Sequence, residues 1–373
     1  MQAELRDRED DGGMAVAGAI ARWTKPMALA PSRIGQAEVL HRLLRAVVVS
    51  QPPTDVLSET RLAVRSAGHF LRCARHLATY RDWFGNAAHV ALREEIALRP
   101  ALLTLAIHPY LNAEWPVARK LAAIGAHYDL LHGKLDFLRF ARADTLVLAD
   151  IGEGLGVRLE KLAKFDHEGE LVISLFCGER RIYCLAFTLG TIGPQTVAYA
   201  GALQGANSED ALAMYRTLTH RLEKMRPRDL LITAFRLLCA SLGVARILAV
   251  ADSHRVCSRP YFKSSVRVFS SYDSAWTECG GTARGDGFFE LDPGVARRPA
   301  GETPARKRAQ YRRRYVLVDA CARQIDEAIA AARAAVLEPM RRGAADGATD
   351  RVPDGASCGG RLATPIRWNV RDS

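Results

Sequence analysis

Hydrophobic residues recur at intervals of three and four positions between Ser32 and Leu131. One such stripe consists of Val39, Leu40, Leu43, Leu44 and Val47. This spacing places apolar side chains on one face of a helix. We therefore expect a helical layer over residues 36–142, preceded by a disordered N-terminus over residues 1–35.

The hydrophobic period changes near Leu146, where apolar and polar residues begin to alternate. Runs of strand length cover residues 157–165, 171–176, 182–189 and 196–203. Short segments rich in turn residues separate these runs, and strands joined in this way pair in antiparallel fashion. The sequence therefore predicts an antiparallel meander.

The segment Ile182–Ser208 contains no charged residue, as a membrane span would. It also contains Gly190, the turn Gly193-Pro194-Gln195 and several threonines. Two buried strands around a turn explain this composition better than one apolar helix does. We therefore expect no integral membrane segment.

Helical and strand patterns alternate after the meander. The predicted elements are helices over 209–224 and 229–242 and strands over 246–251, 266–269 and 287–291. Pro227 breaks the pattern between the two helices, and Gly243 ends the second one.

A long amphipathic helix is predicted from Thr303, a suitable cap, and Pro304, a suitable first residue, to about Glu338. Its apolar stripe consists of Tyr311, Tyr315, Val318, Ala322, Ile325, Ile329, Ala332 and Val336. The sequence thus predicts an α+β protein, with the helical layer followed by a mostly antiparallel sheet, flanking helices and a long C-terminal helix. The sheet and this helix would form a domain over residues 143–340, and residues 341–373 a disordered tail.

Basic residues are concentrated at the start of the long helix. The segment Arg297–Tyr315 holds eight arginines and lysines and one acidic residue, Glu302, which gives it a net +7 of the formal +11. Cations in the first turns of a helix oppose its dipole, and an anionic partner would offset that cost. The predicted anion-binding residues are Arg306, Lys307, Arg308, Arg312, Arg313 and Arg314. A solvated basic face is the competing interpretation.

An anionic lipid is the preferred partner of this segment. Nucleic acid ranks lower, because Tyr311 and Tyr315 lie on the apolar stripe and are expected in the core, where they cannot stack on bases. Arg308 falls at the edge of the same stripe, so we expect it to pair with a buried acid such as Asp286.

The chain of 373 residues, 49% of them hydrophobic, is long enough to bury a large core. Its eight cysteines are scattered without Cys-x-x-Cys spacing, which favours reduced thiols in the cytoplasm. No convergent set of four ligands is evident, so no metal site is expected. The apolar patch Met14–Ala21 is too short for a signal peptide.

Polar residues follow the apolar strand over 246–251 and recur farther along the chain. The candidate catalytic residues are Asp252, His254, Asp273 and Glu278. His254 can act as acid or base near neutral pH, and Asp273 or Glu278 can orient it. We expect residues 252–254 and 272–278 to converge, because a strand end and the following sheet edge are commonly neighbours. A structural role for His254 is the competing interpretation, and a Ser-His-Asp hydrolase is disfavoured because Gly-x-Ser-x-Gly is missing.

An antiparallel sheet, a Gly-containing loop that opens a helix and a buried strand with a polar end together resemble the GNAT superfamily of acyl-CoA N-acyltransferases. In that fold the phosphates of CoA lie on backbone amides at a helix start. The resemblance implies acyl-CoA as a cofactor, bound by Gln204, Gly205, Ala206 and Asn207. The chain departs from the superfamily in lacking its phosphate motif and in connecting the strands by two helices. Tight packing of the sheet against the helix at Gly201 and Gly205 is the competing interpretation.

Several blocks of sequence occur together in a fixed order. They are Tyr199–Gly205, Leu248–Val250 with His254, Tyr272–Glu278, Asp286–Leu291 and Lys307–Tyr315. The combination resembles the VirK/YbjX family of Gram-negative bacterial proteins, from about His41 to Ala335. The resemblance implies a cytoplasmic factor, or one peripheral on the inner membrane, that serves virulence, envelope homeostasis and resistance to antimicrobial peptides and other stress. It supplies no catalytic residues.

Two functions are compatible with these patterns. One is acyl transfer, with Gln204–Asn207 near the cofactor, His254 or Glu278 as the base and Arg306–Arg314 holding an anionic acceptor. The other is non-catalytic docking of an anionic lipid or nucleic acid through the basic helix. The sequence specifies neither the substrate nor the oligomeric state.

Overall fold

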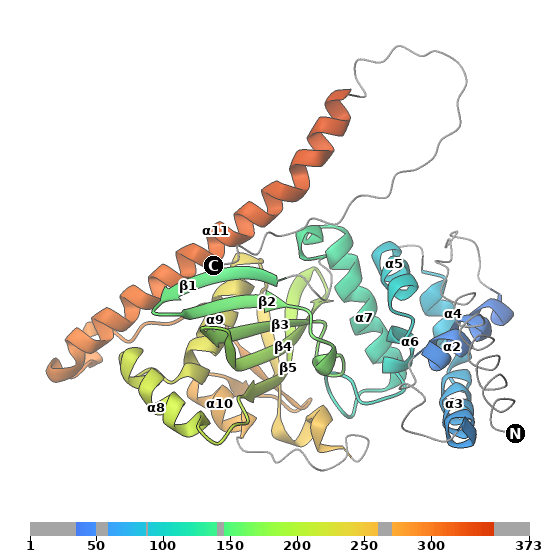
Figure 1. Ribbon diagram of the computed structural model, residues 1–373, viewed down its shortest axis with the longest axis horizontal. Helices are drawn as coiled ribbons and strands as arrows, with labels where there is room; N and C mark the ends of the chain where they lie inside the picture. The colour runs from blue at the N-terminus through green and yellow to red at the C-terminus, as the bar shows by residue number, and fades with distance from the viewer. Residues whose placement is uncertain (1–34, 50–58, 87–88, 140–144, 260–270, 347–373) are drawn as a thin grey trace, which may run out of the picture. The chain divides into compact units, whose positions relative to one another are not determined.

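The computed structural model describes residues 35–49, 59–86, 89–139, 145–259 and 271–346 (Figure 1). The chain divides into two compact units, Met1–Ile107 and His108–Ser373. Within the described ranges, the first unit is helical and the second holds the sheet.

The described part of the first unit is helical, and the helical layer predicted over residues 36–142 extends beyond it into the second unit. The helices of the first unit are α2 (Gln36–Val49), α3 (Glu59–Ala74), α4 (Leu77–Phe84), α5 (Val90–Leu98) and α6 (Leu102–Leu105). Val39, Leu43 and Val47 of the predicted stripe are fully buried, whereas Leu44 is 40% exposed. A hydrogen bond of 2.6 Å from Tyr80 Oη to the carbonyl of Leu103 ties α4 to α6.

The second unit is built on an eight-stranded sheet. Its strands are β1 (Thr145–Gly152), β2 (Leu155–Glu160), β3 (Leu171–Cys177), β4 (Arg180–Ile192), β5 (Gln195–Gly205), β6 (Arg246–Val250), β7 (Thr282–Ala283) and β8 (Phe288–Leu291). They lie in the order β1-β2-β3-β4-β5-β6-β8-β7, and every neighbouring pair is antiparallel except β5 and β6. The predicted α+β class with a mostly antiparallel sheet is confirmed.

One predicted strand ends earlier than its hydrophobic pattern indicates. The pattern continues to residue 165, but β2 stops at Glu160 and Ala163–Phe165 forms a 3-10 turn. Phe165 is buried in a core cluster, and Leu162 packs against that cluster. These apolar residues are therefore buried by a turn instead of a strand. The strand predicted around 266–269 lies outside the described residues.

Helices cover both faces of the sheet. In the second unit they are α7 (Val117–His132), α8 (Ala211–Arg221), α9 (Pro227–Ser241), α10 (Tyr272–Glu278) and α11 (Arg308–Asp346). On β4, the ring of Phe187 contacts Phe235 of α9 at a centroid distance of 5.0 Å, while the hydroxyl of Thr188 lies 3.1 Å from that of Tyr110. Successive side chains of a strand point to opposite faces, so α9 and the segment containing Tyr110 lie on opposite sides of β4.

This two-sided burial explains the uncharged segment Ile182–Ser208. It forms most of β4 and β5, joined at Gly193 with φ at +57°, as the sequence predicts. Strands covered on both faces are apolar throughout because neither face meets water. Among the described residues, no helix is both long enough and apolar enough to span a bilayer.

The long helix begins later and ends later than predicted. Pro304 is extended, with ψ at 137°, and Ala305–Lys307 forms a 3-10 turn before α11 starts at Arg308. Thr303 is buried and donates its hydroxyl hydrogen to the carbonyl of Pro299, so it does not cap the helix. Val318, Ile325, Ile329 and Ala332 of the predicted stripe are buried, and Cys321 is buried in place of Ala322. Tyr311 and Tyr315, which were expected in the core, are half-buried.

Candidate functional site

The sheet opens where β5 extends past its parallel neighbour. The two strands pair over Val197–Ala200 of β5 and Arg246–Ala249 of β6. β6 ends one residue later, whereas β5 continues to Gly205 with pairing only to β4. The edge of β5 that faces β6 is therefore unpaired over residues 201–205 in the described sheet. Ligands commonly bind beyond the carboxyl ends of parallel strands, so this opening is a candidate site.

Two aromatic side chains of α10 close the opening. The backbone amide of Leu203 donates a hydrogen bond of 2.7 Å to Tyr272 Oη. The indole Nε1 of Trp276 donates one of 2.9 Å to the carbonyl of Val250, the last residue of β6. Both side chains are 1% exposed. Tyr272 and Trp276 thus satisfy backbone groups that a longer β6 would otherwise pair.

Two carboxylates hold α10 at this position. Asp252 accepts hydrogen bonds from Ser271 Oγ at 2.6 Å and from the amide of Tyr272 at 2.9 Å. Asp273 in turn accepts one from the amide of Asp252 at 2.7 Å. Partial burial opposes ionisation of Asp252, but these hydrogen bonds outweigh it and hold its pKa below the usual value. The structure therefore brings together residues 252 and 273, as the sequence predicts.

Arg255 joins this cluster from the turn after β6. Its Nη1 donates a hydrogen bond of 3.0 Å to Asp252 Oδ1, and its guanidinium lies 3.5 Å from the ring centroid of Tyr272. The side chain is 7% exposed. Arg255 is therefore a buried cation stacked on the ring that closes the opening.

Glu168 brings a third acidic group to the same region. Its side chain is 6% exposed, and burial raises its pKa from 4.5 to about 7, although the charge of Arg255 acts in the opposite direction. Its negative charge in turn contributes to raising the pKa of Tyr272, which is raised mainly by burial. A carboxyl that titrates near neutral pH can accept or donate a proton under physiological conditions.

The backbone of Glu168 lies directly against the opening. Gly201 forms a bulge in β5, since Ala200 and Ala202 pair with consecutive residues of β4. A Cβ at Gly201 would lie 2.0 Å from the carbonyl oxygen of Glu168. Only glycine permits this approach, so the bulge determines where Glu168 is placed.

The segment before α7 holds the turn that contains Glu168. The amide of Leu111 donates a hydrogen bond of 2.9 Å to the carbonyl of His167. The carbonyl of Pro109 lies 2.9 Å from His167 Nδ1. Burial lowers the pKa of His167, which favours the neutral ring. The turn is therefore fixed on both sides, by Gly201 and by residues 109–111.

His254 and Glu278 do not join the two aspartates. His254 Nδ1 lies 2.8 Å from Ser253 Oγ, and its ring packs against Gly287. Glu278 lies at the other end of α10 and forms ion pairs with Arg226 and Arg228. Within the described ranges, no hydrogen bond connects either residue to Asp273. Their catalytic roles stay predictions.

The loop predicted to bind CoA phosphates is partly engaged within the chain. Gln204 and Gly205 belong to β5 and pair with Cys184 and Tyr183 of β4. The amide of Ala206 is hydrogen bonded to Tyr215 Oη at 2.6 Å. α8 starts only at Ala211, so the amides of 204–207 are not those of a helix start. Phosphate binding by these residues, including Asn207, stays a prediction.

Five of the six predicted anion-binding residues fall into two groups, and the sixth, Arg308, is bonded to Thr303. Arg313 forms two hydrogen bonds with the carboxylate of Glu223, at 2.7 and 2.8 Å, and Arg314 donates to the Glu223 carbonyl. Arg306, Lys307 and Arg312 are exposed, and no described residue forms a hydrogen bond or ion pair with them. The second group is free to contact an anion.

The predicted pairing of Arg308 with Asp286 is wrong. Arg308 is exposed and its Nε donates to the carbonyl of Thr303 at 3.2 Å. Asp286 pairs instead with Arg284, which is two residues away on the same turn. A partner so near in sequence reaches the carboxylate at a smaller entropic cost than one from a distant helix.

Sequence reasoning missed Glu168 and Arg255 as functional candidates. Glu168 lies in the polar segment Asp166–Gly169, whose composition predicts an exposed turn. Its burial results from the contact with Gly201, which is distant in sequence. The sequence feature that could have indicated this burial is the adjacent Gly169. A Cβ at this position would lie 2.5 Å from the amide nitrogen of Phe187. A glycine packed this closely marks a turn pressed onto the sheet.

Comparisons with known proteins identify the family. A family model described as "Protein of unknown function (DUF535)" matches residues 60–327. The uncharacterized protein YbjX of Escherichia coli K12 is 28% identical over 250 residues, 64% of this chain and 76% of YbjX. An uncharacterized protein of Haemophilus influenzae is 28% identical over 160 residues, 43% of this chain and 52% of that protein. No solved structure matches the chain. Because the family match spans most of the chain and its relatives include YbjX, this chain belongs to the DUF535 family of unknown function, the VirK/YbjX family.

Proposed function

We propose that the protein is a GNAT-like acyltransferase, in which a thioester such as acyl-CoA lies along β5 beyond the end of β6. The observation that carries this proposal is the opening beside residues 201–205. The amide of Leu203 points into it and needs an acceptor. An extended ligand with amide groups can supply one by pairing with the strand, as peptides do at open sheet edges.

Tyr272 gives this opening a closed and an open state. Without a ligand its hydroxyl accepts the hydrogen bond from Leu203. A ligand that pairs with the same amide displaces the hydroxyl and leaves it beside the bound thioester. Burial keeps Tyr272 protonated at neutral pH by raising its pKa. The displaced side chain is then a proton donor.

The proposed reaction uses Glu168 and Tyr272 in opposite roles. The acceptor amine attacks the thioester carbonyl while Glu168 takes a proton from the nitrogen. The C–S bond breaks as the C–N bond forms, and the leaving thiolate takes the proton of Tyr272. Arg255, stacked on the tyrosine ring, stabilises the phenolate that this transfer produces. Asp252 and Asp273 position α10, and His254 is a further candidate base on the more accessible side of the cluster.

The acceptor that we propose belongs to the cell envelope. The family resemblance implies envelope homeostasis, virulence and resistance to antimicrobial peptides. The exposed cations Arg306, Lys307 and Arg312 suit an anionic headgroup, because each cation near an anionic membrane contributes about 1 kcal/mol to binding. An enzyme docked in this way would act from the cytoplasmic surface of the inner membrane.

Thiol release tests the proposed reaction. The folded protein is incubated with acyl-CoA of several chain lengths and with amine and hydroxyl acceptors, and free thiol is measured. We expect release that depends on the acceptor and falls roughly 100-fold or more in Glu168→Gln. Equal release by Glu168→Gln, or none with any pair of substrates, would contradict the proposal.

A second candidate function is docking without catalysis. The same three exposed cations support it, and it requires no opening of the sheet. Vesicle binding that is strong and independent of CoA thioesters, together with absence of thiol release, would favour docking over acyl transfer. Nucleic acid stays the weaker partner, because Tyr311 and Tyr315 are half-buried and contact each other and nearby arginines.

A further inference from the structure

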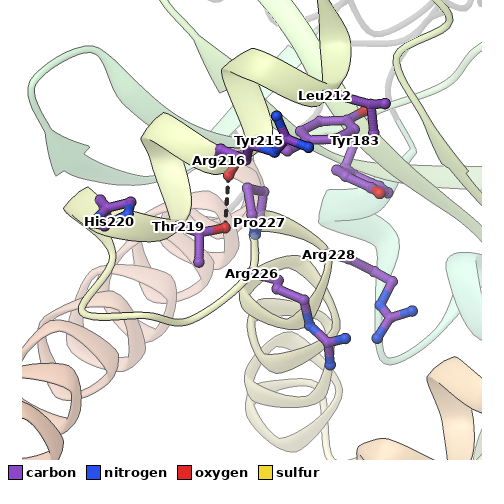
Figure 2. A pocket seen from close by; sticks show the side chains of 9 residues that line it. All are labelled: Tyr183, Leu212, Tyr215, Arg216, Thr219, His220, Arg226, Pro227 and Arg228. Atoms are coloured by element: carbon purple, nitrogen blue, oxygen red, sulfur yellow. Dashed lines mark hydrogen bonds between the residues drawn. The ribbon is translucent and has the colours of Figure 1, made fainter.

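A cavity lies between α8 and the start of α9 (Figure 2). It borders the end of β5, because a Cβ at Gly205 would lie 2.6 Å from the hydroxyl oxygen of Tyr215. Its volume is about 330 Å³, within the range of small-molecule sites. Its walls are formed by Tyr183, Leu212, Tyr215, Arg216, Thr219, His220, Arg226, Pro227 and Arg228. No carboxylate is among these lining residues, whereas three arginines are.

The arginines retain donors for an anion. In both Arg226 and Arg228, Nε donates a hydrogen bond to Asp229 and Nη2 donates one to Glu278. Among the described residues, neither Nη1 has an acceptor. Arg216 is exposed, and no described side chain pairs with it. A guanidinium presents several donors in a plane, which suits phosphate oxygens.

A lysine beside the cavity reinforces this preference. Nζ of Lys224 lies 2.5 Å from Nδ1 of His220, which lines the cavity. The ammonium of Lys224 therefore adds a positive charge beside the cavity. The two acids, Asp229 and Glu278, offset Arg226 and Arg228, so Arg216 and Lys224 account for the net positive charge.

The opposite wall is flat and apolar. The rings of Tyr183 and Tyr215 lie 4.9 Å apart between centroids, at an angle of 35°. Tyr215 is fixed by the hydrogen bond that its hydroxyl accepts from the amide of Ala206 and by one that it donates to the carbonyl of Ile182. Leu212 at the rim is 69% exposed. A planar ring stacked here would cover apolar surface that now meets water.

We propose that this cavity binds a phosphorylated ligand with a planar aromatic ring, the chemistry of a nucleotide. The phosphate contacts Arg216, Arg226 and Arg228, and the ring lies against Tyr183, Tyr215 and Leu212. A free nucleotide and the nucleotide portion of CoA share this chemistry. The inference does not depend on acyl transfer, because a nucleotide bound here would serve equally as a regulator.

Calorimetric titration of the full chain tests the inference. The probes are ADP, CoA, pyrophosphate and adenosine. We expect ADP to bind more tightly than either pyrophosphate or adenosine, since only ADP contacts both walls. If CoA binds at least as tightly as ADP, the ligand of the cavity is CoA. If CoA binds tenfold more weakly than ADP, the ligand is a free nucleotide.

Two matched substitutions locate the ligand. Arg216→Gln removes an exposed charge without a partner, so the protein should fold and bind ADP or CoA at least tenfold more weakly. Arg323→Gln makes the same change on an exposed part of α11, outside the cavity, and should leave binding unchanged. Absence of ADP and CoA binding by the folded protein, or an equal effect of the two substitutions, would overturn the inference. Pyrophosphate binding as tight as that of ADP would also overturn it, because the ring would then contribute nothing.

Discussion

The hydroxyl oxygen of Tyr272 accepts a hydrogen bond of 2.7 Å from the amide of Leu203, at the point where β5 no longer has β6 beside it. The contact joins a helix to the middle of a sheet and is fully buried. It also occupies the position that an extended ligand would take. Together with Trp276, this side chain maintains the closed state of the proposed site.

Tyr272→Phe should destabilise the protein by about 1–3 kcal/mol, because it leaves the buried amide of Leu203 without an acceptor. Urea unfolding of the two proteins measures the difference. Tyr315→Phe is the matched control, since among the described residues Tyr315 Oη accepts a hydrogen bond only from the exposed Arg298 amide. Its effect should stay within about 0.5 kcal/mol. Equal stabilities of Tyr272→Phe and the unaltered protein would mean that the amide finds another acceptor.

Glu168 should make stability fall as pH rises. Its pKa is 4.5 in an unfolded chain and about 7 in the folded protein, so the folded state binds this proton more tightly. The stabilisation is complete below pH 4.5 and is lost as pH rises to about 7, by roughly 3 kcal/mol in all. Unfolding free energies measured across this range should converge on those of Glu168→Gln at low pH and fall below them at high pH. A constant difference between the two proteins would contradict the raised pKa, because it would mean that folding does not change the proton affinity of Glu168.

Gly201→Ala should prevent normal folding or cost several kcal/mol. Its Cβ would lie 2.0 Å from the carbonyl oxygen of Glu168, a backbone atom that packing holds in place. Gly285→Ala is the control, since no atom lies within 4 Å of the Cβ built there. Thermal melts of both variants measure the contrast. A Gly201→Ala variant as stable as the control would mean that the turn 166–169 can move away from β5.

The exposed basic residues should act together on an anionic surface. Substituting Gln for Arg306, Lys307 and Arg312 should weaken binding to anionic vesicles by about 1 kcal/mol for each cation that contacts the surface. Arg313→Gln should have a smaller effect, because Glu223 already neutralises Arg313. Salt should weaken binding of the unaltered protein as well. Unchanged affinity in the triple variant, or equal loss for neutral vesicles, would exclude electrostatic docking.

Local patterns in the sequence predict most of the second unit. The uncharged segment over 182–208 predicts two buried strands, and Pro227 and Gly243 delimit α9. Each of these signals depends on neighbouring residues only. The start of α11 and the end of β2 are exceptions. Thr303 bonds to Pro299 and becomes buried instead of capping the helix, and Phe165 is buried by a turn instead of a strand.

The candidate site depends on contacts between distant segments, which one sequence does not reveal. Asp252 and Asp273 were predictable neighbours because both flank the sheet opening next to β6. Glu168 was not, since its burial follows from the bulge at Gly201. Glu278 and Asp273 lie on one short helix yet contact different partners, because α10 presents them to opposite neighbours.

Hydrogen exchange with saturating acyl-CoA tests the central claim most directly. If the thioester lies along β5, exchange of the amides in residues 201–205 should slow, and exchange in α10 should change as Tyr272 is displaced. Protection confined to α8 and the start of α9 would place the ligand in the cavity between these two helices and not along β5. Absence of any change in 201–205 and α10 would contradict the proposed acyl-transfer site.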